Sequence, residues 1–92
     1  MTENSDTQLS KVLWHCRRGM LELDVMLQRF CTQVYSSLSL EQQQLFELLL
    51  EEADQDLQRW LVGAKPCEQS KFQDMLLVIR HMHIMSKDSQ TA

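Results

Sequence analysis

Helix breakers are scarce in this chain, and their scarcity constrains the fold more than any other feature. The 92 residues include only two glycines and one proline, namely Gly19, Gly63 and Pro66. Between these positions, apolar residues recur at spacings of three and four, which is the period of one helix face. No segment alternates apolar and polar residues as a half-buried strand does. The pattern therefore predicts an all-α fold.

The apolar spacing predicts five helices. The first two are separated by Gly19, and we expect them to pack as an antiparallel hairpin because the break between them is short. The third follows the connector 36–39 and carries Leu45, Leu48 and Leu49 on its apolar face. The apolar residues that define the five helices lie at 9–16, 23–34, 45–49, 57–61 and 72–82.

Local signals mark several helix ends. Ser39 and Gln42 have the spacing of a capping box, in which the hydroxyl accepts a backbone amide and the glutamine reaches back. Asp54 is the expected N-cap of the short fourth helix. We expect Gly63 to end that helix in a left-handed conformation, followed by Pro66, which cannot continue it.

The length of the chain favours one domain and leaves little room for two. A domain of this size buries roughly 60–65% of the surface that its unfolded chain exposes, which supports one modest core without a deep substrate cavity. We therefore predict a compact five-helix bundle over residues 8–86. Flexible polar tails are expected at 1–7 and 87–92, and we expect the bundle to be a monomer.

The formal net charge of −4 argues against nucleic acid as the main partner, since phosphate binding needs clustered cations. It argues equally against an anionic membrane surface. The apolar runs are short, as at 48–50, whereas a membrane-spanning helix needs ~20 apolar residues. The polar N-terminus resembles neither a signal peptide nor a mitochondrial presequence. We therefore expect no membrane insertion and a location in a bacterial cytoplasm.

The three cysteines include no CxxC pair. Cys16 and Cys31 would lie on neighbouring helices at different distances from the turn between them. Their stagger along the helix axes would be on the order of 10 Å, whereas a disulfide tolerates Cα separations up to about 7 Å. We expect these two cysteines and Cys67 to be reduced thiols, in keeping with a cytosolic protein.

Signals of catalysis or metal binding are weak. His81 and His83 are two positions apart, so on a helix they point to nearly opposite sides and cannot share one metal ion. One of them is expected to be exposed and the other to lie at the edge of the core. The sequence has no glycine-rich phosphate loop and no clear nucleophile–base arrangement. We predict no metal site and no catalytic residue.

The stretch 14–24 places two arginines, one glycine and two acids around a helix break. A cation suits the end of the first helix, but a second adjacent arginine is more charge than packing requires. A compact patch of both signs suits docking on a polar partner surface. The candidate partner-binding residues are Arg17, Arg18, Gly19, Glu22 and Asp24.

This stretch resembles the RGxxE region of the succinate dehydrogenase flavinylation factors, bacterial SdhE and its mitochondrial relative, assembly factor 2. Arg18, Gly19 and Glu22 stand at the motif positions, and the wider form W-x-C-R-R-G-M-x-E-L-D is matched throughout. A second block resembles the family pattern L-L-x-x-x-D-x-D-L-x-x-W-L-x-G, which is followed closely by a proline. It consists of Phe46, Leu49, Leu50, Asp54, Asp56, Leu57, Trp60, Leu61, Gly63 and Pro66.

The resemblance covers residues 14–80 and implies a function. The chain would be a FAD assembly factor, not an enzyme, whose partner is the apo flavoprotein subunit of succinate dehydrogenase or of fumarate reductase. The FAD would belong to that partner, on which a histidine becomes joined to the 8α-methyl group, and the chain itself would hold no cofactor tightly. Arg17 and Arg18 would pair with partner acids or carbonyls, and Glu22 and Asp24 with partner cations. Gly19 would let the two backbones approach closely.

Other interpretations of the same residues stay open. Gly19 is equally expected as the turn of the hairpin. Glu22 could act as an acid of the first helical turn that reaches back to the amide of Gly19. Trp14 and Trp60 are more often core residues than anchors. A helical adaptor or antitoxin-like regulator that uses the same face is the alternative function, and a direct flavin carrier is a further one.

Overall fold

The computed structural model describes the backbone of residues 2–91 and the side chains of residues 8–85. Over this part of the chain every regular element is a helix, so the all-α prediction is confirmed. A 3-10 turn, η1, follows α2, and a π-helical segment, η2, continues α4 without a break. The elements in chain order are α1 (Thr2–His15), α2 (Leu21–Val34), η1 (Tyr35–Ser37), α3 (Leu40–Leu49), α4 (Asp54–Leu57), η2 (Gln58–Val62) and α5 (Ser70–Thr91).

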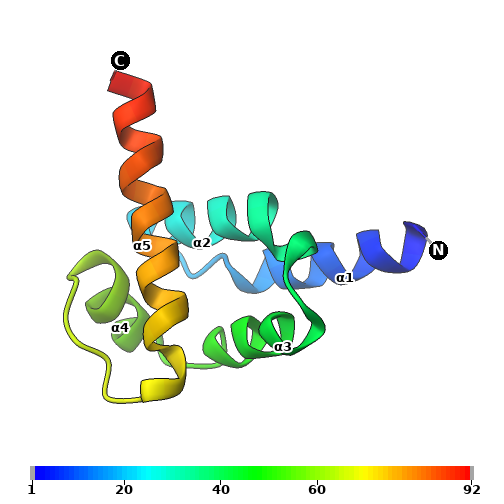
Figure 1. Ribbon diagram of the computed structural model, residues 1–92, viewed down its shortest axis with the longest axis horizontal. Coiled ribbons are helices and arrows are strands. Elements are labelled where there is room, and N and C mark those ends of the chain that lie inside the picture. Colours follow the sequence, from blue (N-terminus) through cyan, green and yellow to red (C-terminus); the bar gives the residue numbers. More distant parts are fainter. Residues whose placement is uncertain (1, 92) are drawn as a thin grey trace.

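The helices form one globule in which α2 is central. It lies against α1 on one side and against α5 and η2 on another, while α5 also contacts α3. In Figure 1, α1 and α2 run in opposite directions and α5 stands across α2. The radius of gyration is 13.0 Å, close to the value of about 12 Å for a compact domain of this length. A single compact domain is therefore confirmed, whereas flexible tails at 1–7 and 87–92 stay a prediction, since those side chains lie outside the described residues.

The core is built from the predicted apolar stripes. The aromatic rings of Phe30 and Phe46 lie 5.1 Å apart between their centroids, and those of Trp60 and Phe72 lie 6.4 Å apart. Tilted ring pairs at this range add to the stabilisation from burial. The largest fully buried side chains are Trp60, Phe30, Phe46, Phe72, Leu23, Leu27, Leu49, Leu57 and Ile79.

The buried face of α3 differs from the prediction. Phe46, Leu49 and Leu50 are buried, Leu45 is half-buried, and Leu48 is 42% exposed. Five of the six residues at 45–50 are apolar, including three in a row at 48–50, so that spacing alone does not select which of them face inward. The large ring of Phe46 occupies the core, and Leu48 is turned toward solvent.

Two of the three predicted helix ends need correction. Ser39 caps α3 as expected, since its Oγ accepts from the Gln42 amide at 3.2 Å. The N-cap of α4 is Ala53, not Asp54, which is the first residue of the helix. At the end of η2 the left-handed residue is Ala64, with φ 55°, whereas Gly63 has φ −78°. Position 63 nevertheless favours glycine, because a Cβ there would lie 2.9 Å from the carbonyl oxygen of Arg59.

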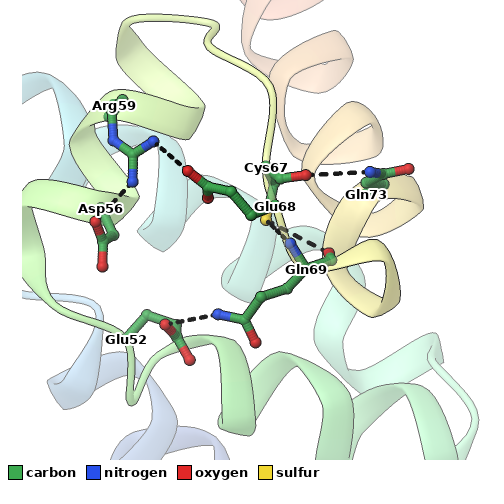
Figure 2. A network of polar contacts seen from close by, with 7 residues as sticks. All are labelled: Glu52, Asp56, Arg59, Cys67, Glu68, Gln69 and Gln73. Atoms are coloured by element: carbon green, nitrogen blue, oxygen red, sulfur yellow. Dashed lines mark hydrogen bonds and ion pairs between the residues drawn. The ribbon is translucent and has the colours of Figure 1, made fainter.

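Polar contacts fix the loop between η2 and α5 (Figure 2). Arg59 donates to Asp56 at 2.8 Å and to Glu68 at 3.0 Å. Gln69 donates to Glu52 at 3.0 Å, which joins the start of α5 to the connection between α3 and α4. These contacts tie the loop before α5 to α4, η2 and the α3–α4 connection.

The relation between Cys16 and Cys31 also needs correction. All three cysteines are free and buried, as expected, but Cys16 and Cys31 lie close enough for each thiol to shift the pKa of the other. Residues 17–20 form a non-helical loop between the two helices, so the register of α1 against α2 is not that of a tight hairpin. The neighbouring Cys31 thiol and burial raise the pKa of the Cys16 thiol, so this thiol is protonated at neutral pH.

None of the helices in the described part of the chain is long and apolar enough to cross a membrane.

Candidate partner-docking site

The loop from Arg17 to Met20 is folded around one carboxylate. Oδ1 of Asp24 accepts from the backbone amides of Arg18 at 2.9 Å and Met20 at 3.3 Å, and Oδ2 accepts from the amide of Gly19 at 3.1 Å. Gly19 has φ +80°, a left-handed conformation that allows consecutive amides to converge on one anion. Asp24 therefore fixes the shape of the loop. This is the reach-back role that the sequence interpretation considered for Glu22.

The guanidinium of Arg18 faces inward. It donates to the carbonyl oxygens of His15 at 2.8 Å, Leu50 at 2.7 Å and Glu52 at 2.9 Å. Its Nε also lies 2.9 Å from Oδ1 of Asp54, as an ion pair whose angle departs from that of a hydrogen bond. The side chain is 14% exposed. Arg18 thus satisfies carbonyl groups near the ends of α1 and α3, which lack partners within their helices, and it joins the loop to the α3–α4 connection.

Arg17 and Trp14 face outward. The guanidinium carbon of Arg17 lies 5.3 Å from the centre of the Trp14 ring, a cation–π contact. Trp14 is 67% exposed, so the expectation that it belongs to the core is wrong, whereas Trp60 is buried as expected. The reason is helical phase. Val12 and Cys16 face the core, and a residue two positions from each points to the opposite side of α1.

Leu21 and Glu22 extend this surface onto the first turn of α2. Leu21 is 84% exposed although it begins a helix whose other leucines are buried. Glu22 is also exposed, and its Oε2 lies 3.3 Å from Nε2 of His83 on α5. A Cβ added at Gly19 would meet no atom within 4 Å, so there is open space outside the loop.

The five predicted site residues lie together, on one loop and the first turn of α2, but they divide into two groups. Arg18 and Asp24 are internal and shape the loop. The other three belong to an outward surface, here called the exposed corner, to which two further residues contribute. The exposed corner consists of Trp14, Arg17, Gly19, Leu21 and Glu22.

Sequence reasoning missed Trp14 and Leu21 as members of this surface. The signal that could have found Leu21 is its phase. It lies about 200° around the helix from Leu23, at 100° per residue, and Leu23 belongs to the buried stripe with Met26 and Leu27. No local signal announces the contact of Glu22 with His83, because the two residues are 61 positions apart.

The exposed corner is suited to protein recognition. Aromatic residues and arginine are enriched at the energetic centres of protein interfaces, and this surface combines both with an acid and an exposed leucine. Within the side chains that the structure describes, no three histidine, cysteine or acidic residues converge as metal ligands would.

Comparison with known proteins gives a consistent result. A family model, Sdh5, described as "Flavinator of succinate dehydrogenase", matches residues 10–83. The FAD assembly factor SdhE of Coxiella burnetii is 37% identical over 79 residues, which cover 86% of this chain and 96% of that protein. SdhE of Shewanella oneidensis is 43% identical over 72 residues, or 78% and 88% of the two chains. SdhE of Pseudomonas aeruginosa is 42% identical over 74 residues, or 80% and 88%.

No solved structure matches the chain significantly. The matched region includes the exposed corner, the loop that supports it and the buried core. The family model covers far more than half of the chain, and the relatives match over most of their own length. The chain therefore belongs to the Sdh5/SdhE family of FAD assembly factors, the flavinators of succinate dehydrogenase.

Proposed function

We propose that this protein promotes covalent attachment of FAD to the flavoprotein subunit of succinate dehydrogenase, and that it docks on the apo subunit through the exposed corner. The flavoprotein subunit of fumarate reductase is a second partner in this proposal. The protein acts as an accessory factor in the bacterial cytoplasm and as a monomer. FAD is held by the partner, and the reacting groups are the flavin and a histidine of the partner.

The observation that carries the docking proposal is the contrast between the inner and outer sides of one loop. Asp24 and Arg18 together make seven polar contacts on the inner side, three with backbone amides, three with carbonyls and one with Asp54. Trp14 and Leu21 are mostly exposed on the outer side. A loop that is already rigid loses little entropy on binding, which favours affinity.

The proposed mechanism is a shift of conformational population. If the protein binds one conformation of the apo subunit better than the others, that conformation becomes more populated. The favoured conformation is the one in which the partner histidine and the 8α-methyl group of FAD are aligned, and such alignment accelerates bond formation. Arg17 then meets acids or carbonyls of the partner, Glu22 meets cations, and Trp14 and Leu21 bury apolar surface.

Binding to the purified apo flavoprotein subunit tests the proposal. Trp14→Ala should weaken binding about tenfold or more, the usual effect of truncating an aromatic anchor, and Glu22→Gln should also weaken it. Leu40→Ala and Glu41→Gln are matched controls, because Leu40 is 70% exposed and Glu41 is an exposed acid in the first turn of α3. Both controls lie at the opposite end of α3 from the Leu50 carbonyl that Arg18 contacts. Equal affinities for all four variants would contradict docking through the exposed corner.

A further inference from the structure

One residue of the exposed corner is held by a helix from the other end of the chain. Because α5 stands across α2 (Figure 1), Nε2 of His83 comes to 3.3 Å from Oε2 of Glu22. The His83 side chain is 9% exposed, whereas that of Glu22 is 49% exposed. A buried imidazole on α5 therefore contacts an acid that faces the solvent on α2.

Packing alone does not account for a histidine at this position. Nδ1 of His83 is buried and has no hydrogen-bond partner among the described residues. A buried polar atom without a partner is destabilising, and an apolar ring of similar size would avoid that cost. The neutral form with its proton on Nε2 can donate to Glu22 and leaves only an acceptor unpaired at Nδ1.

The surroundings strengthen the contact between the two side chains. Glu22 and His83 line one hollow of about 190 Å³ beside apolar side chains of α2, η2 and α5, among them Met26, Leu61 and Ile84. Interactions between polar groups are stronger beside apolar walls than in open water. Arg80 lines the same hollow, so a positively charged residue also borders it.

We propose that His83 is a positioning residue for partner docking, which holds the Glu22 carboxylate in the orientation that meets a cationic group of the flavoprotein subunit. This inference rests on the proposed function. Glu22 touches the partner, whereas His83 acts through Glu22. A glutamate fixed before binding does not have to be ordered by the partner, and ordering one flexible side chain at an interface costs about two- to tenfold in affinity.

Three substitutions at position 83 separate positioning from packing. His83→Phe keeps a ring in the core but removes the donor, and we expect a two- to tenfold weaker affinity for the apo subunit. His83→Gln can place an amide donor near the position of Nε2, and it should recover most of the affinity. His83→Asn is too short to do so and should resemble His83→Phe. If His83→Phe fails to fold, the comparison of the glutamine and asparagine variants decides the matter, and equal affinities for these two would overturn the proposal.

A double-mutant cycle shows whether His83 acts through Glu22. In a Glu22→Gln background, His83→Phe should cause much less further loss, because two residues that act as a unit are not additive. Full additivity of the two losses would overturn the positioning role while leaving docking by Glu22 intact. No loss from Glu22→Gln itself would instead count against the proposed function. Melting curves of all variants confirm that equal amounts of folded protein are compared.

Discussion

Two residues in the described part of the chain have left-handed backbone conformations, and only one of them is a glycine. Gly19 has φ +80° with open space where a Cβ would lie, and Ala64 has φ 55°. A left-handed conformation is strained for any residue with a Cβ and is natural for glycine. Position 19 therefore has the residue type that its backbone conformation favours, whereas position 64 does not.

Exchanging these residue types should change stability in opposite directions. Gly19→Ala should lower the free energy of unfolding by about 1 kcal/mol, since the torsion angle and not a collision is at fault. Ala64→Gly should raise it by about 0.5 kcal/mol, because relief of strain exceeds the entropy that glycine adds to the unfolded chain. Urea denaturation measures both, and a stability change of the same sign in the two variants would contradict the backbone assignment.

Arg18 is the residue whose role the structure alters most. Its removal would leave three carbonyl groups and Asp54 without their partner. Arg18→Ala should lower the free energy of unfolding by about 2–4 kcal/mol, in the range for breaking a largely buried charged contact. Arg18→Lys should recover only part of this loss, because an ammonium group cannot reach several acceptors as the planar guanidinium does. Chemical denaturation that places Arg18→Ala within about 0.5 kcal/mol of the wild type would show that these contacts matter little. A loss of flavinylation in Arg18→Ala is therefore no direct measure of docking.

The connection between α1 and α2 shows how a short non-helical loop changes the register of two helices. The stagger expected from a tight hairpin separates Cys16 from Cys31, whereas with the loop at 17–20 the two thiols are neighbours. The same segment carries the outward-facing Arg17 and Gly19, so the register of α1 against α2 also sets the position of the exposed corner.

Burial should protect the thiols in the native protein. Cys16 and Cys31 have no exposed surface and Cys67 is 7% exposed. We expect a thiol reagent to react slowly with the folded protein, at a rate limited by opening of the structure, and to label all three cysteines in denaturant without prior reduction. Fewer than three labels in denaturant would indicate a disulfide. Rapid labelling of Cys16 in the folded state would contradict the packing of α1 on α2.

Two neighbouring leucines of α3 provide a matched pair of substitutions that tests which face of the helix is buried in the core. Leu49 is fully buried and its neighbour Leu48 is 42% exposed. Leu49→Ala should lower the free energy of unfolding by about 2–5 kcal/mol, whereas Leu48→Ala should change it by less than about 0.5 kcal/mol. Equal effects in urea denaturation would mean that the rotation of α3 about its axis is wrong.

At the scale of the whole molecule, local patterns predict the elements, and long-range contacts decide how single residues are used. Helical spacing predicts the five helices and the burial of residues such as Leu27 and Trp60, because burial repeats with the helix period. The inward turn of Arg18 was not predictable, because its acceptors at Leu50 and Glu52 lie 32 and 34 positions away. The contact of His83 with Glu22 was hidden for the same reason.

The candidate site was predicted as a segment rather than as a surface. The charge pattern at 17–24 identifies the right loop, but it does not separate side chains that shape the loop from those that face a partner. The exposure of the side chains in the structure makes that separation. Trp14 and Leu21 are exposed and belong to the surface, whereas the Arg18 side chain is largely buried and does not. The remaining question is whether this surface controls flavin attachment.

Covalent flavin on the partner subunit is the most direct measurement of that control. The flavoprotein subunit of succinate dehydrogenase is co-expressed with each variant in a host that lacks its own assembly factor, and flavin fluorescence of the denatured subunit band is recorded beside a melting curve of the variant. Glu22→Gln and Trp14→Ala should melt near the wild type and leave the subunit underflavinylated, whereas the controls Glu41→Gln and Leu40→Ala should support normal flavinylation. Normal flavinylation with both Glu22→Gln and Trp14→Ala would contradict the claim that the exposed corner is the docking site.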